Sequence, residues 1–446
     1  MTDDIDNEQD APAELSLGEA LGLALRLHRE KAYEGAEALY RRIIEAAPEL
    51  ADAHHFLGVL CHESGRSAEG IASIRRAIEL VPDFPGFYNN LGNIHMQCGQ
   101  LAEATACYGR AIQLAPDDAN LHNNHGALLK AEKRFEEAAA SFQRAMALDP
   151  GNVRAYNNMG LLHAAQGQTP AAIRYYCESI SRIPGHPEAH KLLGLTYYSL
   201  GRHEEAAEVF RQWVEVAPEH PVARHMYAAC SGQGVPARAA DDYVEYTFDR
   251  FASSFEEQLN LKLSYQAPQL CASALARQAG ARRGLDLLDA GCGTGLCGPL
   301  VAPLCARLVG VDLSGGMLDL AATKGVYTEL TKAELTEFLL GQGQVWDVIM
   351  SADTLCYFGD LRRVVAAAAG ALKADGLLVF TVEQADDGAT PDGFRINPHG
   401  RYSHTRGHVE AVIRAAGLVL LEAGEDSLRT EGGKPVQGLV VVARKP

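Results

Sequence analysis

One pattern of apolar and polar positions recurs every 34 residues in the N-terminal half of the chain. Prolines mark the period at Pro48, Pro82, Pro116, Pro150, Pro184 and Pro218. Small residues recur twice in each period, at Gly58, Gly92, Gly126, Gly160 and Gly194, and at Ala36, Gly70, Ala104, Ala138, Ala172 and Ala206. The small side chains let two helices approach closely, and proline ends the second helix. We therefore expect about twelve helices between residues 17 and 220, and a thirteenth over 221–230 that caps the exposed end.

The C-terminal half changes to short apolar runs of the kind that form buried strands. The segment 285–298 (LDLLDAGCGTGLCG) begins with such a run, ends it at Asp289 and continues with Gly291, Gly293 and Gly295. This order predicts a buried strand, a tight glycine turn and the start of a helix. Further strands are expected over 306–312, 346–352, 376–382, 418–422 and 438–443.

The glycine turn is a candidate ligand site, because a ligand can approach a backbone that carries no Cβ. In the dinucleotide fingerprint the third glycine follows the second by three residues, whereas here it follows by two. The carboxylate of Asp289 would repel a pyrophosphate but would suit an ammonium or sulfonium group. These features favour S-adenosylmethionine as the ligand.

The acid and the alternate glycines resemble the first motif of the class I S-adenosylmethionine-dependent methyltransferases. The resemblance covers roughly residues 240–446 and implies a seven-stranded sheet closed by an antiparallel hairpin. It implies that Asp312, at the end of the second strand, faces the ribose hydroxyls, and that Glu334 accepts from the adenine amino group. The full set of implied cofactor contacts is Asp289, Gly291, Cys292, Gly293, Gly295, Asp312, Leu313, Met317, Glu334, Asp353 and Tyr265.

The 34-residue period resembles the tetratricopeptide repeat. Asparagine pairs recur in three consecutive repeats, and asparagine has no local reason to recur inside helices. A similar asparagine ladder in O-GlcNAc transferase holds an extended polypeptide, so Asn90, Asn124 and Asn158 are candidates for binding a protein or peptide acceptor. The alternative is that these amides are solvated or hydrogen-bond between repeats.

Composition narrows the choice of partners. The formal net charge of -17 disfavours a nucleic-acid partner, because phosphate binding needs a basic surface.

The acidic residues 1–14 are expected to be disordered. The lack of a leader or an apolar run of membrane-spanning length predicts a cytoplasmic protein without a membrane partner. The ten cysteines form no CxxC pair, which indicates reduced thiols. The repeated histidines His54, His122 and His190 are interpreted as packing residues, and no metal site is expected.

The acceptor should lie beyond the carboxyl ends of the fourth and fifth strands, where open sheets bind ligands. There the sequence has Glu383 and then a polar loop over 394–405. His399 or His404 could act as a base, with Tyr402 nearby, while Arg395 and Arg401 could clamp a carboxylate. Ahead of the first strand, helices over 243–255 and 259–268 should form a lid lined by Tyr246, Phe251, Phe255 and Tyr265.

These observations predict a chain of the α plus α/β class with an all-α repeat solenoid and a Rossmann-like domain. The expected parts are a tail over 1–14, a solenoid of six repeats and a capping helix over 15–235, a linker with lid helices over 236–284, and a methyltransferase core over 285–446. The expected function is methylation of an oxygen or nitrogen of an acceptor that the solenoid recruits. The alternatives are a small-molecule methyltransferase with a scaffolding solenoid, or a non-catalytic adaptor that binds the cofactor. The sequence leaves the oligomeric state open.

Overall fold

The computed structural model describes residues 15–258, 265–386, 390, 392–431 and 434–446, with the backbone alone for 250–258. Within it the chain forms two compact units, Met1–Ala189 and His190–Pro446, which are described separately. The tail predicted over 1–14 lies outside the described residues. No helix in the described part of the chain has both the length and the apolar composition needed to cross a bilayer.

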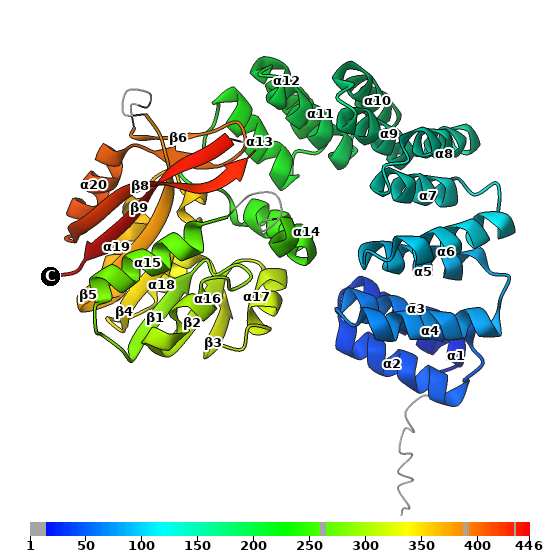
Figure 1. Cartoon of the computed structure of the whole chain (residues 1–446), viewed down its shortest axis with the longest axis horizontal. Helices are drawn as coiled ribbons and strands as arrows, with labels where there is room; N and C mark the ends of the chain where they lie inside the picture. The colour runs from blue at the N-terminus through cyan, green and yellow to red at the C-terminus, as the bar shows by residue number, and fades with distance from the viewer. Residues whose placement is uncertain (1–14, 259–264, 387–389, 391, 432–433) are drawn as a thin grey trace, which may run out of the picture. The chain divides into compact units, whose positions relative to one another are not determined.

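The repeats form helix pairs, as the period predicts. The first helix of a repeat has 13 residues and the second has 14, as α3 and α4 do. The predicted twelve helices and the capping helix are confirmed (Figure 1). They are α1 (Leu17–Arg29), α2 (Tyr33–Ala46), α3 (Ala51–Glu63), α4 (Ser67–Leu80), α5 (Pro85–Gln97), α6 (Leu101–Leu114), α7 (Ala119–Ala131), α8 (Phe135–Leu148), α9 (Val153–Ala165), α10 (Thr169–Arg182), α11 (Pro187–Ser199), α12 (His203–Val216) and α13 (Pro221–Ser231).

The glycine of each first helix provides room for an aromatic side chain of the second. A Cβ added to Gly126 would lie 2.7 Å from the ring of Phe142, and one added to Gly160 would lie 2.3 Å from Tyr176. Both rings are buried, as is Ala138 beside Phe142 on α8. The small residues and the aromatics are therefore two halves of one packing arrangement, which accounts for their constant spacing in the sequence.

In the second unit, α13 packs against the turn that precedes Arg401. His225 of α13 hydrogen-bonds the backbone oxygen of Gly400 at 2.7 Å, and its ring stacks on Tyr243 with 3.7 Å between centroids. Tyr243 belongs to α14 (Asp241–Gln258), which the helical spacing of aromatics predicted. The expected second lid helix, over 259–268, falls largely outside the described residues, and α15 begins at Ala267 and ends at Ala279.

The strands form one sheet with the order β3-β2-β1-β4-β5, to which β9 is added antiparallel to β5 and β8 antiparallel to β9. Within this sheet of nine strands, seven form the predicted arrangement with its closing hairpin. These seven are β1 (Leu285–Ala290), β2 (Cys305–Asp312), β3 (Glu329–Lys332), β4 (Trp346–Ser351), β5 (Leu372–Gln384), β8 (Val419–Glu431) and β9 (Lys434–Arg444).

The segment 394–405 differs from the polar loop that its composition suggested. It forms a short antiparallel hairpin of β6 (Phe394–Ile396) and β7 (Tyr402–His404), and β7 pairs with the end of β5 through Glu383 and Gln384. Pairing with β5 draws every residue of β7 into the interior. The polar side chains of this segment are therefore not all available to a ligand.

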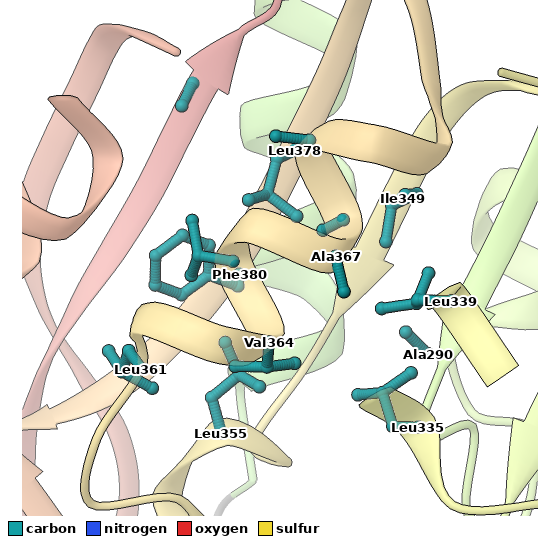
Figure 2. Packing of buried hydrophobic residues seen from close by; sticks show 14 of the residues in the cluster. Ala290, Leu335, Leu339, Ile349, Leu355, Leu361, Val364, Ala367, Leu378 and Phe380 are labelled. Atoms are coloured by element: carbon teal, nitrogen blue, oxygen red, sulfur yellow. The ribbon is translucent and has the colours of Figure 1, made fainter. Parts of the chain in front are cut away.

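Both faces of the sheet are covered by helices. On one face α18 (Leu335–Leu340), α19 (Arg362–Ala371) and α20 (Arg406–Ala415) bury a cluster that includes Leu339, Val364 and Phe380. Figure 2 shows Val364 and Ala367 of α19 in one buried cluster with the strand residues Leu378 and Phe380. On the other face α15 packs on β1, β4 and β5. This burial fixes the carboxyl ends of the strands, where ligands bind in such sheets.

Candidate functional site

A cavity of about 210 Å³ lies at the carboxyl ends of the central strands. Its walls come from the loops after β1, β2 and β4, from the N-terminus of α18, from the segment 238–248 and from β8. The segment 238–248 is held there by backbone hydrogen bonds, since Ala239 donates to Tyr357 at 2.8 Å and Gly359 donates to Ala237 at 2.8 Å. The cavity belongs entirely to the unit His190–Pro446.

The glycine turn forms the floor of the cavity. Gly291, Gly293 and Gly295 all have positive φ angles, of 77°, 53° and 81°. A Cβ on Gly291 would lie 2.3 Å from the side chain of Thr354, whereas one on Gly293 would meet no protein atom within 4 Å. Gly293 lines the cavity, so its missing Cβ leaves space for a ligand. Gly295 does not line the cavity and faces Tyr327 and Ala321 instead.

Asp289, at the end of β1, is a buried carboxylate that does not itself line the cavity, and one of its oxygens is unsatisfied. The hydroxyl of Tyr327 donates to Oδ2 at 2.6 Å, while Oδ1 has no hydrogen-bond partner among the described residues. Burial raises the pKa of Asp289 to about 7, and the bond from Tyr327 opposes that rise. An unsatisfied buried carboxylate oxygen is costly unless a ligand supplies a donor or a positive charge.

Asp312 ends β2 and lines the cavity, as expected for a ribose-binding acid. Its two oxygens accept from the backbone N–H groups of Gly293 and Ser314, each at 2.9 Å. A carboxylate has about four acceptor positions, so two remain for ligand hydroxyls. Burial raises the pKa of Asp312, although these backbone donors work in the opposite direction.

The other residues predicted to contact the cofactor are distributed around this end of the cavity. Cys292, Leu313 and Met317 line it. Glu334 also lines it, but as the N-cap of α18 it already accepts from the backbone of Glu337 at 2.8 Å. The roles of these residues remain predictions.

Together these features fit S-adenosylmethionine. The unsatisfied oxygen of Asp289 suits the ligand's positive charge, the open space at Gly293 suits close approach to the backbone, and Asp312 has acceptor positions for two hydroxyls. Tyr265 and Asp353, which were predicted to contact the cofactor, line the cavity as well.

The predicted acceptor residues are only partly brought together. Arg401 lines the cavity, but Arg395 is exposed on β6, so the proposed pair does not form a clamp. His404 is fully buried and hydrogen-bonds the oxygen of Gly359 at 3.0 Å. The buried Tyr402 donates to the oxygen of Pro236 at 2.7 Å.

Neither His404 nor Tyr402 lines the cavity, because β7 runs inside the unit beside β5. Glu383 and His399 lie behind Arg401, with 3.6 Å between His399 Nε2 and Glu383 Oε2, and they do not line the cavity either. Burial, with a contribution from Arg401, lowers the pKa of His399 to about 4, which leaves its ring neutral at pH 7. The structure therefore does not support catalytic roles for these four residues.

The four aromatic residues expected to line a lid over the cofactor do not lie together in the described part of the chain. Tyr265 lines the cavity, and Tyr246 packs with His220 at 5.1 Å between ring centroids. The side chains of Phe251 and Phe255 lie outside what the structure describes. Phe248 of α14, which the sequence interpretation did not select, lines the cavity.

Several wall residues carried no recognisable signal in the sequence. Arg429 and Glu431 come from β8, 76 residues or more after Asp353, and only the pairing of β8 with β9 brings them to the cavity. Arg238 arrives through the backbone pairing of its segment with residues 357–360. Thr354 and Tyr357 follow β4 directly, so the position of that strand could have identified them.

In the first unit the asparagines form hydrogen bonds between successive repeats. Asn124 donates to Asn89 and Asn158 donates to Asn123, each at 2.9 Å, and Asn90 bonds His55 at 2.8 Å. The series ends at Asn157, which is 2% exposed and has no partner for its amide among the described residues. In the sequence, the residue 35 positions after Asn157 is Leu192, which has no amide to donate.

Ligand binding at Asp289 gives a testable pH dependence. The affinity for S-adenosylmethionine is expected to fall about tenfold from about pH 7 to about pH 5.5, because protonation of Asp289 removes the negative charge while the ligand's amino group stays protonated. Replacing Tyr327 by phenylalanine should raise the pKa of Asp289 and weaken binding further at pH 7. Calorimetric titration measures both effects. Asp289→Asn should abolish the pH dependence, and a wild-type affinity that is constant over this range would contradict the role of Asp289.

Two kinds of protein family match separate parts of the chain. A methyltransferase-domain family matches residues 288–380. Tetratricopeptide-repeat families match residues 92–131 and 126–167, and 21–85 and 157–221. The repeat matches therefore include α12 and most of α11, which belong to the same compact unit as the sheet.

Curated relatives match the C-terminal half. The ubiquinone biosynthesis O-methyltransferase of Pasteurella multocida is 27% identical over 148 residues, which are 30% of this chain and 61% of the relative. The malonyl-[acyl-carrier protein] O-methyltransferase of Acetivibrio thermocellus is 32% identical over 99 residues, 22% of this chain and 35% of the relative. The chain thus spans less than two thirds of the length of each. Among solved structures, the type IV pilus biogenesis factor PilW covers 48% of this chain and 98% of its own, with 20% identity and a TM-score of 0.42.

Proposed function

Since this chain is a tetratricopeptide-repeat protein with a class I methyltransferase domain, we propose that it transfers a methyl group from S-adenosylmethionine to an oxygen or nitrogen atom of a protein or peptide acceptor. The observation that carries the methyltransferase part is the cavity between Gly293, Asp312 and Asp353, with the unsatisfied oxygen of Asp289 behind it. The names of both curated relatives contain O-methyltransferase, which favours oxygen as the methylated atom.

The bound cofactor would supply an electrophilic methyl group on a positively charged sulfur. The protein's part is to orient it and exclude water. Asp312 would hold the ribose, and the glycine turn would carry the ligand close to the charge of Asp289. Tyr265, Phe248 and Tyr357 would shield the cavity from solvent, which strengthens every polar contact inside it.

Recruitment by the solenoid is the second part of the proposal. The first helices of successive repeats contact one another, α5 with α7 and α7 with α9, and so form one continuous surface. Asn90, Asn124 and Asn158 are half-buried on that surface, and each bond between repeats uses only one of two amide hydrogens. The remaining hydrogen can donate to the backbone of an extended chain.

The hydrogen bonds between asparagines of neighbouring repeats favour a second candidate function. Amides that join neighbouring repeats have a structural reason to recur, so a small-molecule methyltransferase with a scaffolding solenoid also accounts for them. The two candidates share the cofactor site and differ in what the solenoid surface binds. The domain boundaries proposed from the sequence, at 15–235, 236–284 and 285–446, apply to both.

The cofactor site is tested by replacing Asp312 with alanine. The loss of two charge-assisted bonds from ribose hydroxyls is expected to cost roughly 1.5 to 3 kcal/mol, which is about a ten- to hundredfold loss of affinity for S-adenosylmethionine. Calorimetry on folded protein measures it. Asp319→Ala, at an exposed position on the neighbouring helix α17 (Gly315–Ala322), is the control and should bind normally.

An unchanged dissociation constant in folded Asp312→Ala would exclude this assignment. Transfer of labelled methyl groups to proteins of a cell lysate then tests the acceptor class. Label in protein supports the leading proposal, whereas label only in small molecules supports a scaffolding solenoid. Cofactor binding without any transfer would support the adaptor alternative.

A further inference from the structure

Charged side chains cluster at the end of the cavity that lies beyond β4 and β5. Asp353 follows β4, Glu383 stands at the end of β5, Arg401 precedes β7, and Arg429 and Glu431 come from the end of β8. All but Glu383 line the cavity. The side chains of Arg429 and Glu383 are 3% and 5% exposed, so the charges of this cluster interact with little screening by water.

Each arginine of the cluster is already bound by carboxylates. Arg429 Nη1 donates to both oxygens of Asp353 at 2.7 Å, its Nε donates to Glu431 at 2.6 Å, and its Nη2 contacts Glu383. Arg401 Nε donates to Glu383 at 2.6 Å, and its Nη2 contacts Glu431. The two guanidinium groups therefore have their strongest bonding directions occupied by the protein itself.

The cluster contains one more carboxylate than guanidinium groups, and Arg429 and Arg401 oppose the rise in the pKa of Asp353 that burial causes. Three carboxylates, those of Asp353, Glu383 and Glu431, face two guanidinium groups, and His399 beside them is neutral at pH 7. Although burial alone would raise it, the pKa of Glu431 is held at about 2 by Arg401 and Arg429, so this acid is ionised. A carboxylate entering here would meet an excess of negative charge and no guanidinium without a partner.

Asp353 is the carboxylate of the cluster with an unusual backbone. Its φ of 57° is in the left-handed region that few residues other than glycine adopt. The hydroxyl oxygen of Thr381 accepts from its backbone N–H at 2.8 Å, and both side-chain oxygens are oriented by Arg429. Strained conformations of this kind persist where a site requires a particular side-chain direction, and this side chain lines the cavity.

We infer that this cluster is the acceptor subsite, that it takes an acceptor whose reacting atom is a hydroxyl oxygen or an amine nitrogen and not a carboxylate, and that Asp353 accepts the hydrogen of that group. The inference rests on the proposed function. In the transfer, the acceptor's oxygen or nitrogen forms the new bond to the methyl carbon. The bond from that carbon to sulfur breaks with its electron pair left on sulfur, and the acceptor's proton passes to a carboxylate oxygen of Asp353.

Binding of simple probes to the whole chain tests this inference. Because Tyr265, Tyr357 and Phe358 line the cavity, three aromatic probes of one skeleton are chosen: benzylamine, benzyl alcohol and benzoate. Each is titrated by calorimetry at pH 7 into protein saturated with S-adenosylhomocysteine, the product that remains after the methyl group has left. Benzylamine and benzyl alcohol are each expected to bind at least tenfold more tightly than benzoate.

The variant Asp353→Asn identifies the group responsible. Arg429 keeps Glu383 and Glu431 as partners in this variant, so the arrangement is retained. The affinity for benzylamine should fall about tenfold. The affinity for S-adenosylhomocysteine should change less than threefold, because Asp353, which the sequence resemblance counted among the cofactor contacts, here faces the acceptor. Glu425→Gln, which neutralises an exposed acid of the same strand β8, is the matched control and should bind all probes as the wild type does.

The outcomes separate this inference from the proposed function. If the wild type does not bind S-adenosylhomocysteine, the proposed function itself fails. If it binds that compound but prefers benzoate, or binds none of the three probes, the acceptor subsite is wrong and the cofactor site stands. The ranking of probes on the wild type decides the acceptor class even if the Asp353→Asn chain is unstable.

Discussion

Replacing Arg429 by alanine is expected to lower the free energy of unfolding of the unit His190–Pro446 by about 3 to 5 kcal/mol. The guanidinium group is buried and bound to Asp353, Glu383 and Glu431. Its removal would leave carboxylates without their partner in the interior, and breaking a buried ion pair from one side has costs of about this size. This is the largest change in stability that we expect from a single substitution at the cavity.

Tryptophan fluorescence during urea unfolding reports this change selectively. The chain has two tryptophans, Trp213 and Trp346, and both are buried in the unit that contains Arg429. The control is Arg363→Ala, which removes an arginine whose side chain is 71% exposed and pairs with Glu337. An exposed pair contributes little, so this variant should lose less than about 1 kcal/mol. Equal losses in the two variants would contradict the buried network.

The stability lost in Arg429→Ala should depend on pH, and the direction of this dependence follows from the pKa shifts of the carboxylates that Arg429 contacts. The pKa of Glu431 is lowered in the folded chain from 4.5 to about 2, and that of Glu383 is lowered as well. A group with a depressed pKa contributes stability above its unfolded value and loses it as the pH falls through the folded value. The stability deficit of Arg429→Ala should therefore be complete at pH 7 and should shrink below about pH 4.5.

Local patterns were sufficient to predict the solenoid and the sheet. A repeat encodes its packing within about 34 residues, because Gly126 and the ring that fills its space, Phe142, are close in sequence. The glycine turn is equally local, and Gly291, Gly293 and Gly295 all have positive φ angles there. Such features need no information from distant parts of the chain.

The acceptor end of the cavity could not be predicted in the same way. Arg429 reaches Asp353 across 76 residues, and the contact depends on the pairing of β8 with β9 and of β9 with β5. The polar composition of 394–405 suggested an exposed loop, yet pairing with β5 buries Tyr402 and His404. Composition describes which side chains a segment carries, whereas strand pairing decides where they point.

The asparagine ladder was predicted to bind something outside the helices, and its amides bond neighbouring repeats. These two roles make different predictions for the triple substitution Asn90→Ala, Asn124→Ala and Asn158→Ala. At about 0.5 to 1.5 kcal/mol for each hydrogen bond, the loss of three should cost on the order of 1.5 to 4.5 kcal/mol. If the asparagines only bond neighbouring repeats, this whole cost is a loss of folding stability in the unit Met1–Ala189.

The recruitment proposal predicts a further effect on the Michaelis constant for a protein acceptor. The remaining amide hydrogens would grip the backbone of that acceptor, so their removal should raise its Michaelis constant at least tenfold. Turnover on a minimal acceptor such as benzyl alcohol should barely change, because the substituted residues all belong to the unit Met1–Ala189, whereas the cavity belongs to the other. Both constants are measured from transfer of labelled methyl groups.

Stability and recruitment can be separated in the same protein. Circular dichroism follows the helices of the solenoid during urea unfolding, while tryptophan fluorescence is silent there because both tryptophans lie in the other unit. Gln113→Ala, at an exposed position in the last turn of α6, is the control for an amide outside the ladder. A triple variant that remains folded at the assay temperature and shows a normal Michaelis constant for the protein acceptor would make the ladder purely structural. The scaffolding solenoid would then be the better account of this half of the chain, because the amides would have no function left beyond holding successive repeats in register.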